Sequence, residues 1–403
     1  MEVRCCIVGG GPAGMVLGFL LARAGVDIVV LEKHADFLRD FRGDTIHPST
    51  LELIYELGIL ELFLRQPHQE LVQIGGQIED FQVTIADFSH LSTHCKFIAL
   101  MPQWDFLNFI ADQGKQYSQF KVLMESEVTG LIEEDGRIAG VRASTPSGIL
   151  EVRANLTIGA DGRYSIVREK AGLDVIDLGA PIDVLWMRFS RQPDDPNQTL
   201  GRVRSGKILV TLNRGDYWQC AYVIAKGAFE AIRETGLTRF REDITAVAPF
   251  LRGRVNELKD WNDIKLLSVA VDRLRQWSRA SLLCIGDSAH AMSPIGGVGI
   301  NLAIQDAVAA ANILARPLLS GALDAKRLRE VQRRREFPTR MTQGFQVFAH
   351  KHVLRPVLGN ETRIRRLPLP FRLLQRFPVL RRIPARMVGI GFRPEHVRTP
   401  DMT

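Results

Sequence analysis

Three glycines near the amino terminus have the spacing of a phosphate-binding turn. Residues 9–14 read Gly-Gly-Gly-Pro-Ala-Gly, so Gly9, Gly11 and Gly14 fill the pattern G-x-G-x-x-G, with Pro12 and Ala13 between them. In this pattern the glycines allow a tight turn, a close approach of backbone to a pyrophosphate, and close helix–strand packing. The helix that follows offers free N–H groups to phosphates. The spacing therefore predicts dinucleotide binding.

An acidic residue follows at the distance where such turns bind a ribose. Glu32 ends the apolar run 26–31, and Lys33 is its neighbour. A carboxylate at this point accepts hydrogen bonds from ribose hydroxyls. The elements that must position these residues are a strand at 3–8, a helix at 13–24 and a strand at 26–31. That order predicts a βαβ unit with parallel strands.

Two later segments carry further acids and glycines. Residues 158–163 read Ile-Gly-Ala-Asp-Gly-Arg, with the acid at Asp161. Residues 283–290 read Leu-Cys-Ile-Gly-Asp-Ser-Ala-His, with the acid at Asp287 after a buried-strand pattern. A glycine-rich loop at 294–301 then leads into a helix predicted from about Asn301 to Leu314. An acid at the carboxyl end of a parallel strand is placed to bind a ligand, and a helix N-terminus stabilises negative charge.

Together these segments resemble the p-hydroxybenzoate-hydroxylase-like family of FAD-dependent monooxygenases, the single-component class A flavoproteins. Their order and spacing match from the amino terminus to about residue 306. The resemblance implies bound FAD, transient NADPH or NADH, and O2 as the second substrate. It also implies a C4a-hydroperoxyflavin that hydroxylates or epoxidises an aromatic or lipophilic small molecule.

The resemblance assigns further residues to FAD. Arg42 would reach the pyrophosphate, Gln103 the ribityl chain, and Asp287 a hydroxyl of the ribose or ribityl chain. Asp161 would serve a structural or cofactor role. The loop residues assigned to the flavin are Pro294, Gly297, Gly299, Ile300 and Asn301.

The fold class predicted from these patterns is α/β. It comprises a Rossmann-like FAD-binding domain with a glutathione-reductase-like βαβ unit, an inserted antiparallel-sheet substrate domain and a helical C-terminal region. The β-rich runs 183–190 and 207–224 lack βα alternation, which predicts a separate sheet. The expected division is 1–180 with 265–350 for FAD, 181–264 with parts of 70–100 for substrate, and a basic, proline-interrupted region at 351–403.

Side chains on the inserted sheet are the candidates for binding substrate. Strand alternation groups Trp186 with Arg188, and Trp218 with Cys220 and Tyr222; Pro294 completes the set. An aromatic face suits a flat or hydrophobic substrate, although the same residues also fit an ordinary sheet core. No residue stands out as the base that deprotonates substrate. Arg188, Tyr222, His47 and His290 are weak candidates, each with a structural alternative.

Composition excludes several classes of protein. The chain has 403 residues, 46% hydrophobic and 24% charged, which excludes disorder, collagen and coiled coil as the main architecture. At about 150 residues per domain, two or three domains are expected. Five cysteines without metal or redox spacing predict buried thiols in a reducing compartment. Neither a signal peptide nor a membrane-spanning run is recognised, so a cytoplasmic protein is expected.

The net charge of +7 is concentrated at one end of the chain. Residues 351–403 hold one lysine and eleven arginines against three acids, a net charge of +9. The remainder is nearly neutral, which argues against nucleic-acid binding. The basic, apolar tail predicts either packing over the substrate domain or a partner subunit, or peripheral contact with an anionic membrane. Either a monomer or a homodimer fits.

Two alternatives to the monooxygenase remain open from the sequence. One is an O2-independent FAD-dependent reductase or dehydrogenase of a lipid-like substrate, which shares the first glycine motif. The other is a flavin-binding scaffold without turnover. A second G-x-G-x-x-G unit and a redox cysteine pair are absent, so reductases with a separate nicotinamide domain fit poorly. No metal-ligand spacing stands out among the nine histidines.

Overall fold

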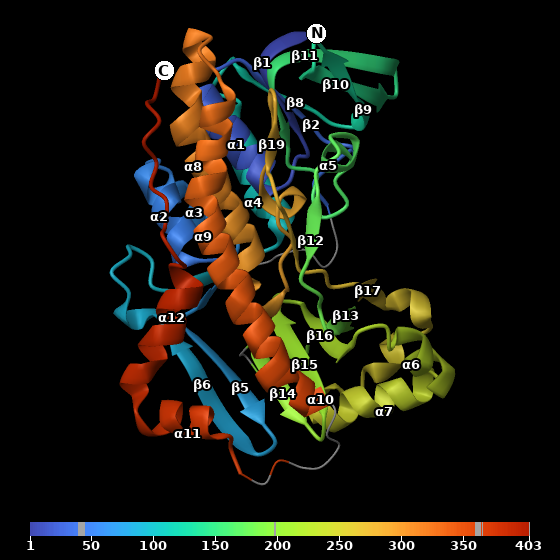
Figure 1. Cartoon of the computed structure of the whole chain (residues 1–403). Coiled ribbons are helices and arrows are strands. Elements are labelled where there is room, and N and C mark those ends of the chain that lie inside the picture. The colour runs from blue at the N-terminus through green and yellow to red at the C-terminus, as the bar shows by residue number, and fades with distance from the viewer. Residues whose placement is uncertain (39–44, 197–198, 359–363, 365, 403) are drawn as a thin grey trace.

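The computed structural model describes residues 1–38, 45–196, 199–358, 364 and 366–402. Two large sheets lie one above the other in Figure 1, and long helices join them along one side. The predicted α/β class with a second sheet and a helical C-terminal region is confirmed.

The first sheet contains the predicted βαβ unit. Its strands run in the order β19 (Ser278–Arg279), β20 (Leu282–Cys284), β11 (Gly148–Gly159), β1 (Glu2–Val8), β2 (Ile28–Leu31) and β8 (Phe120–Leu123). β1 is parallel to β11 and β2, and β20 is parallel to β11. The antiparallel strands β9 (Glu127–Glu134) and β10 (Arg137–Thr145) extend from β11. β2 is buried along its whole length, as expected for a parallel strand covered on both faces.

Four helices pack on or beside this sheet. They are α1 (Pro12–Arg23), α4 (Gln103–Gly114), α8 (Val298–Ser320) and α9 (Ala325–Ala349). α8 is longer at each end than the helix predicted at 301–314, and left-handed Gly297 and Gly321 flank it. Residues 295–320 are long and apolar enough to cross a membrane, yet 67% of their most apolar window is buried in the fold. α8 is therefore a core helix, packed against α1 and α9.

The second sheet is mostly antiparallel. Its order is β17 (Lys265–Leu267), β13 (Ile182–Ser190), β16 (Tyr217–Ala225), β15 (Lys207–Asn213), β14 (Leu200–Arg204), β5 (Gln73–Ile78) and β6 (Phe81–Asp87). The helices α6 (Phe229–Thr235) and α7 (Leu237–Val247) cover one face. The other face packs against Ile295 of the glycine-rich loop and against residues of α10 (Arg355–Leu358).

Short elements connect the two sheets. They are β3 (Thr45–Ile46), α2 (Pro48–Glu56), α3 (Leu60–Leu64), β4 (Gln69–Leu71), β7 (Ile98–Leu100), α5 (Ile166–Lys170), β12 (Val175–Asp177) and β18 (Asp272–Leu274). The sequence predicts one helix over 48–62, but the structure has two. Gly58 lies between them with a φ of 73°, which an α-helix does not contain.

The C-terminal region crosses the second sheet and then returns to the first. After α10 come α11 (Leu369–Arg376) and α12 (Arg382–Gly389), which lie beside β6 in Figure 1. The last residues run back along α8 to α1. Arg23 donates to the Thr399 carbonyl at 2.9 Å, and the Met402 amide donates to the Arg23 carbonyl at 2.9 Å. The tail thus ties the second sheet to the first.

All five cysteines are free and buried, as the sequence predicts. Burial raises the pKa of Cys6 to about 12, so this thiol stays protonated and unreactive at neutral pH.

Candidate functional site

The glycine turn has the close contacts that its spacing predicts. A Cβ on Gly9 would lie 2.4 Å from the Ala160 carbonyl oxygen, and one on Gly14 would lie 2.0 Å from the Gly9 carbonyl oxygen. Gly9 also has a φ of 107°. A Cβ on Gly11, by contrast, would meet nothing within 4 Å. Two glycines therefore hold the turn against the sheet, and the third leaves open space at the N-terminus of α1, where Pro12 and the buried Ala13 begin the helix.

Glu32 follows β2 and lies against this turn. Its Oε2 accepts from the Gly10 amide at 3.0 Å, and its Oε1 accepts from the His34 amide at 3.1 Å. The carboxylate is thus fixed against Gly10, the residue before Gly11. Lys33 next to it is exposed. Arg42 lies outside the described residues, and Gln103 is the first residue of α4.

The two later acids differ in what they contact. Asp161 accepts from the Ser165 hydroxyl at 2.5 Å and from the Val167 amide at 3.1 Å, so it caps α5. Burial raises the pKa of Asp161, and these hydrogen bonds offset part of that rise. Asp287, in a 3-10 turn after β20, forms a 3.4 Å ion pair with Arg163 and stays partly exposed. The described geometry therefore gives Asp161 a structural role and leaves Asp287 open to a ligand.

The glycine-rich loop is joined to β3 and α2 through one amide side chain. Asn301 is buried, and its Oδ1 accepts from the His47 amide and the Thr50 hydroxyl, each at 2.8 Å. Its Nδ2 donates to the carbonyls of Thr45 at 2.9 Å and Gly297 at 3.2 Å. Gly299 and Ile300 lie between these points in the first turn of α8. Asn301 therefore fixes the loop's position against the segment that follows residue 44.

A row of polar side chains at the end of α9 and at the residue after it supports the segment that leads into this loop, and the sequence reasoning missed it. Gln343 donates to the Ala291 carbonyl at 3.1 Å. Gln346 contacts both the amide and the carbonyl of Ser293, at 3.1 and 2.9 Å. His350 lies 2.9 Å from the Ser293 hydroxyl. The three residues share one helix face, and that spacing was the available signal.

A buried ionic cluster lies behind the loop and was also missed. Asp306 in α8 contacts His290 Nε2 at 2.5 Å, accepts from Arg335 Nε at 2.9 Å, and accepts from the Gly286 amide at 3.1 Å. Burial alone would raise the pKa of Asp306, but His290 and Arg335 hold it below the usual value. His290 is thereby engaged as a structural residue, which argues against its role as a substrate base. Arg335 also forms an ion pair with Glu395 of the tail at 3.5 Å.

His47 has an orientation suited to accepting a proton. The ring is fully buried, and Nδ1 lies 2.8 Å from the Val388 carbonyl of α12. A carbonyl only accepts, so Nδ1 carries the proton and Nε2 presents its lone pair. Nε2 is buried without a hydrogen-bond partner among the described residues. Burial lowers the pKa of His47 to about 4, so the neutral ring dominates at neutral pH.

The second sheet separates the predicted substrate residues into two groups. Trp218, Cys220 and Tyr222 are buried on the face under α7, where the Trp218 indole donates to Asp195 at 2.8 Å. This placement corrects the expectation that they bind substrate, and it removes Tyr222 as a candidate base, because the glycine-rich loop lies on the other side of the sheet. Burial raises the pKa of Tyr222 well above its usual range.

The opposite face is the one near the loop. Trp186 is half-buried there, together with Val210, Val223 and Ile295. Arg188 is two residues further along the strand and is exposed, with its guanidinium 4.9 Å from the Tyr217 ring centre. Pro294 at the start of the loop is exposed. Of the predicted substrate set, Trp186, Arg188 and Pro294 thus remain available on the loop side or at the surface.

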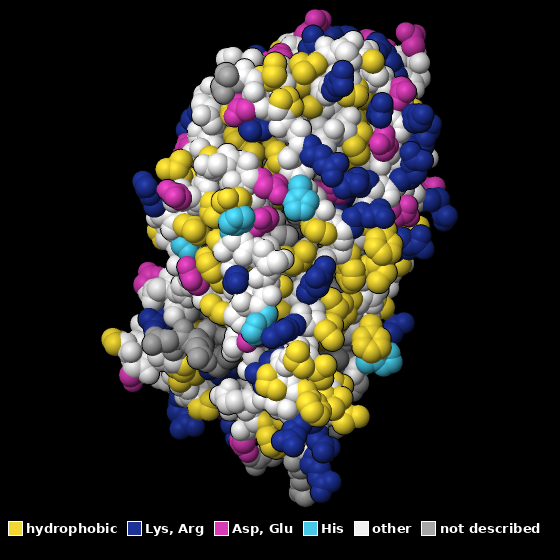
Figure 2. Space-filling model, turned by 90° about the vertical axis from the view of Figure 1, so that its left-hand side faces the viewer, with side chains coloured by type: hydrophobic (Ala, Val, Ile, Leu, Met, Phe, Trp, Pro, Cys, Tyr) yellow, Lys and Arg dark blue, Asp and Glu magenta, His cyan; other side chains and the backbone are white. Residues whose placement is uncertain are grey.

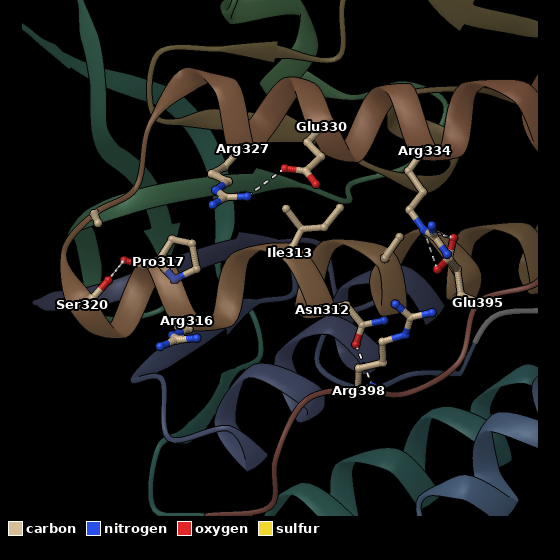
Figure 3. Close-up of a pocket in the computed structure, with 12 residues that line it drawn as sticks. Asn312, Ile313, Arg316, Pro317, Ser320, Arg327, Glu330, Arg334, Glu395 and Arg398 are labelled. Carbon is tan, nitrogen blue, oxygen red and sulfur yellow. Dashed lines mark hydrogen bonds and ion pairs between the residues drawn. The ribbon is translucent and has the colours of Figure 1, made fainter.

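A surface groove of about 550 Å³ lies elsewhere, between α8, α9 and the C-terminal tail. Figure 3 shows Arg334 of α9 paired with Glu395 at 2.8 Å, and Asn312 of α8 bonded to the Arg398 amide at 2.8 Å. Arg327 is paired with Glu330 across its rim at 3.0 Å. The contacts of Arg334 and Asn312 hold the tail in place, and none of the predicted cofactor or substrate residues lines the groove.

These features define a dinucleotide site: a loop, an acid and an open glycine turn meet at the carboxyl edge of a parallel sheet. The comparisons with known proteins identify the class of protein to which the site belongs. Residues 2–344 match the family model described as "FAD binding domain". The 6-methylpretetramide 4-monooxygenase of Streptomyces rimosus is 34% identical over 354 residues, covering 87% of this chain and 84% of that protein. The chain therefore belongs to the FAD binding domain family, and it is an FAD-dependent monooxygenase.

More distant relatives and solved structures agree with this assignment. A para-nitrophenol 4-monooxygenase of a Pseudomonas species is 24% identical, with 78% of each chain covered. The structure of pqsL, described as a probable FAD-dependent monooxygenase from Pseudomonas aeruginosa, has a TM-score of 0.75 at 20% identity. The alignment covers 89% of this chain and 99% of that chain. At that identity the structural likeness supports the fold alone.

The site fits FAD on its own geometry. A Cβ at Gly11 would meet nothing within 4 Å, which suits the approach of a pyrophosphate, and Glu32 is fixed at the neighbouring Gly10, where it could bind a ribose. The N-terminus of α8 follows the glycine-rich loop, and a helix N-terminus favours developing negative charge. Bound FAD would supply hydride acceptance from NAD(P)H and the activation of O2. The protein residues position the cofactor and the substrate and exclude water.

Proposed function

We propose that this enzyme hydroxylates an aromatic compound that carries a ring hydroxyl, of the polycyclic polyketide type. The observation that carries the proposal is the 34% identity to 6-methylpretetramide 4-monooxygenase across 87% of the chain. The name of the para-nitrophenol 4-monooxygenase, a more distant relative, also specifies a phenolic substrate. NADPH or NADH would serve as the reductant, and O2 as the source of the inserted oxygen.

His47 is the residue we propose to activate the substrate. Its Nε2 lone pair would accept a hydrogen bond from the ring hydroxyl once the bound substrate displaces the side chains that cover the buried ring, because Nδ1 is already committed to the Val388 carbonyl. As oxygen is transferred to the ring carbon, this hydrogen bond would polarise the hydroxyl O–H toward Nε2, which raises the electron density of the aromatic ring. The low pKa of His47 keeps the ring neutral, and thus able to accept, before the reaction.

The remaining site residues have supporting roles in this proposal. Gly9, Gly11, Gly14, Glu32 and Asp287 would hold FAD, and the loop with Gly297, Gly299, Ile300 and Asn301 would border the flavin. Trp186 and Pro294 would form an apolar surface for the substrate, and Arg188 would bind an acidic substituent at its edge. Residues 1–180 with 265–350 would form the FAD domain, 181–264 with parts of 70–100 the substrate domain, and 351–403 the basic C-terminal region. A monomer or homodimer in the cytoplasm fits the proposal.

The direct test uses 18O2 and a panel of polycyclic phenols with the purified flavoprotein. Label in the product is expected for the wild type, and His47→Leu is expected to lower product formation about a hundredfold while NAD(P)H oxidation continues. His47→Gln offers an acceptor oxygen near the position of Nε2 and should recover part of the loss. His90→Leu, at an exposed site, is the control. Unchanged product formation by His47→Leu would refute the assignment of His47, whereas unlabelled product would refute the hydroxylation.

A further inference from the structure

The α11–α12 surface is an outward-facing patch in which large apolar side chains alternate with arginines. Its apolar members are Leu369, Leu373, Phe377, Val379 and Ile383, and its exposed basic members are Arg372, Arg376, Arg382 and Arg386. Leu369 is 62% exposed, Val379 58% and Ile383 59%. Figure 2 views this side of the molecule, and hydrophobic side chains gather in its lower part with Lys and Arg among them.

The inner sides of these helices are already occupied. Ala385 of α12 is fully buried, and together with Val388 it packs against Phe88 and Leu91 beside β6. The Val388 carbonyl also contacts the His47 ring. α12 therefore cannot bury its outer apolar side by turning over, because that would expose the inner side and break the contact with His47.

The charges on this surface select its partner. Residues 366–394 contain seven arginines and neither Asp nor Glu. The four exposed arginines of the surface have no ion-pair partner among the residues that the structure describes. A second copy docked on the same surface would place arginine against arginine, which is unfavourable. A bilayer that contains anionic lipid offers both complementary charge and a medium for protruding apolar side chains.

We propose that the α11–α12 surface docks on an anionic lipid bilayer, with Leu369, Phe377, Val379 and Ile383 inserted among the lipids and the arginines at the headgroups. This peripheral docking would hold the α12 side of the substrate site close to the bilayer. The proposal concerns where the enzyme is held and does not depend on the identity of its substrate.

Co-sedimentation of the FAD-loaded full chain with vesicles tests the proposal. We expect binding to vesicles that mix phosphatidylcholine with phosphatidylglycerol, weak binding to phosphatidylcholine alone, and loss of binding as salt is raised. Arg372→Gln with Arg376→Gln should weaken partitioning roughly twentyfold to thirtyfold, about fivefold for each charge. Phe377→Ser with Ile383→Ser should weaken it at least tenfold, by about the transfer of two apolar side chains.

Matched controls separate docking from general effects of charge and hydrophobicity. Arg137→Gln with Arg252→Gln removes the same charge from exposed sites elsewhere, and Tyr164→Ser with Ile149→Ser removes exposed apolar side chains elsewhere. Both should bind vesicles as the wild type does. Flavin absorbance and melting temperature confirm that each variant is folded. The proposal is overturned if the wild type fails to sediment with anionic vesicles, or if the α11–α12 variants bind as well as their controls. It is also overturned if the Phe377→Ser, Ile383→Ser pair instead dissociates a dimer in analytical ultracentrifugation.

Discussion

His47 should make folding stability depend on pH between about pH 4 and 6.5. The ring is fully buried, and its pKa is lowered from 6.5 to about 4. In the unfolded chain the ring takes up a proton as the pH falls through about 6.5, whereas the folded protein resists protonation until about pH 4. The stabilisation is therefore complete above the unfolded pKa and is lost as the pH falls toward the folded one. The difference of about 2.5 pKa units corresponds to about 3.4 kcal/mol at most.

The size of the effect at each pH follows from the same two pKa values. His47 should lower the free energy of unfolding by about 2 kcal/mol near pH 5 and by about 3 kcal/mol near pH 4, relative to neutral pH. The free energy of unfolding can be measured across this pH range by urea unfolding of the wild type and of His47→Gln, followed by flavin and tryptophan fluorescence. The variant should lose that part of the pH dependence, and exposed His352→Gln should keep it. Identical pH dependence in the wild type and His47→Gln would refute the reasoning.

Three further perturbations probe the loop and the buried ion pairs. Gly297→Ala should release FAD, because φ is 63° and a Cβ would lie 2.3 Å from a threonine hydroxyl of β3; the flavin content of the purified protein measures this. Asp306→Asn should lower the free energy of unfolding in urea by about 3–5 kcal/mol, because the buried Arg335 loses its 2.9 Å carboxylate partner and retains only the 3.5 Å ion pair with Glu395. The pKa of Asp195 is lowered to about 2, because the ion pair with Arg254 outweighs the effect of burial. The free energy of unfolding should therefore fall by roughly 2 kcal/mol as the pH is lowered from about 4 to 2. Asp195→Asn should not show this loss.

The first two of these perturbations each have a matched control and a result that would contradict the expectation. Gly344→Ala, within α9 and with open space at its Cβ, should keep full flavin content. Glu230→Gln breaks an exposed ion pair and should cost under about 0.5 kcal/mol. Full FAD occupancy in Gly297→Ala would show that the loop tolerates a side chain. A loss below about 1 kcal/mol in Asp306→Asn would show that the cluster is well solvated.

The C-terminal segment connects several of these observations. It contributes Val388 to the contact with His47 and Glu395 to the cluster of Arg335 and Asp306, and it ends against Arg23 of α1. Substitutions in this segment are therefore expected to alter the positions of the substrate-site residues and the loop, although none of the predicted FAD-binding residues lies in the segment.

The local patterns were sufficient for the parts of the protein that depend on neighbours in sequence. The glycine spacing at 9–14, the alternation of strand and helix, and the buried run of β2 are short-range properties, because a turn or a parallel strand imposes its own residue types. The dinucleotide-binding fold class followed from them, whereas FAD and its chemistry were implied by the family resemblance of the three motif segments. The helix boundaries followed less well, since Gly58 divides one predicted helix and α8 begins before its predicted start.

Tertiary structure decided which residues face the site. Alternation along β16 places Trp218, Cys220 and Tyr222 on one side, but only the positions of α7 and the 291–301 loop determine that this side is the core. His47 and Val388 are 341 residues apart, so the sequence could not reveal which nitrogen of the ring is left to accept a proton. The buried cluster around Asp306 likewise joins α8, α9 and the tail. Such contacts arise from the packing of distant segments, and periodicity within one segment carries no information about them.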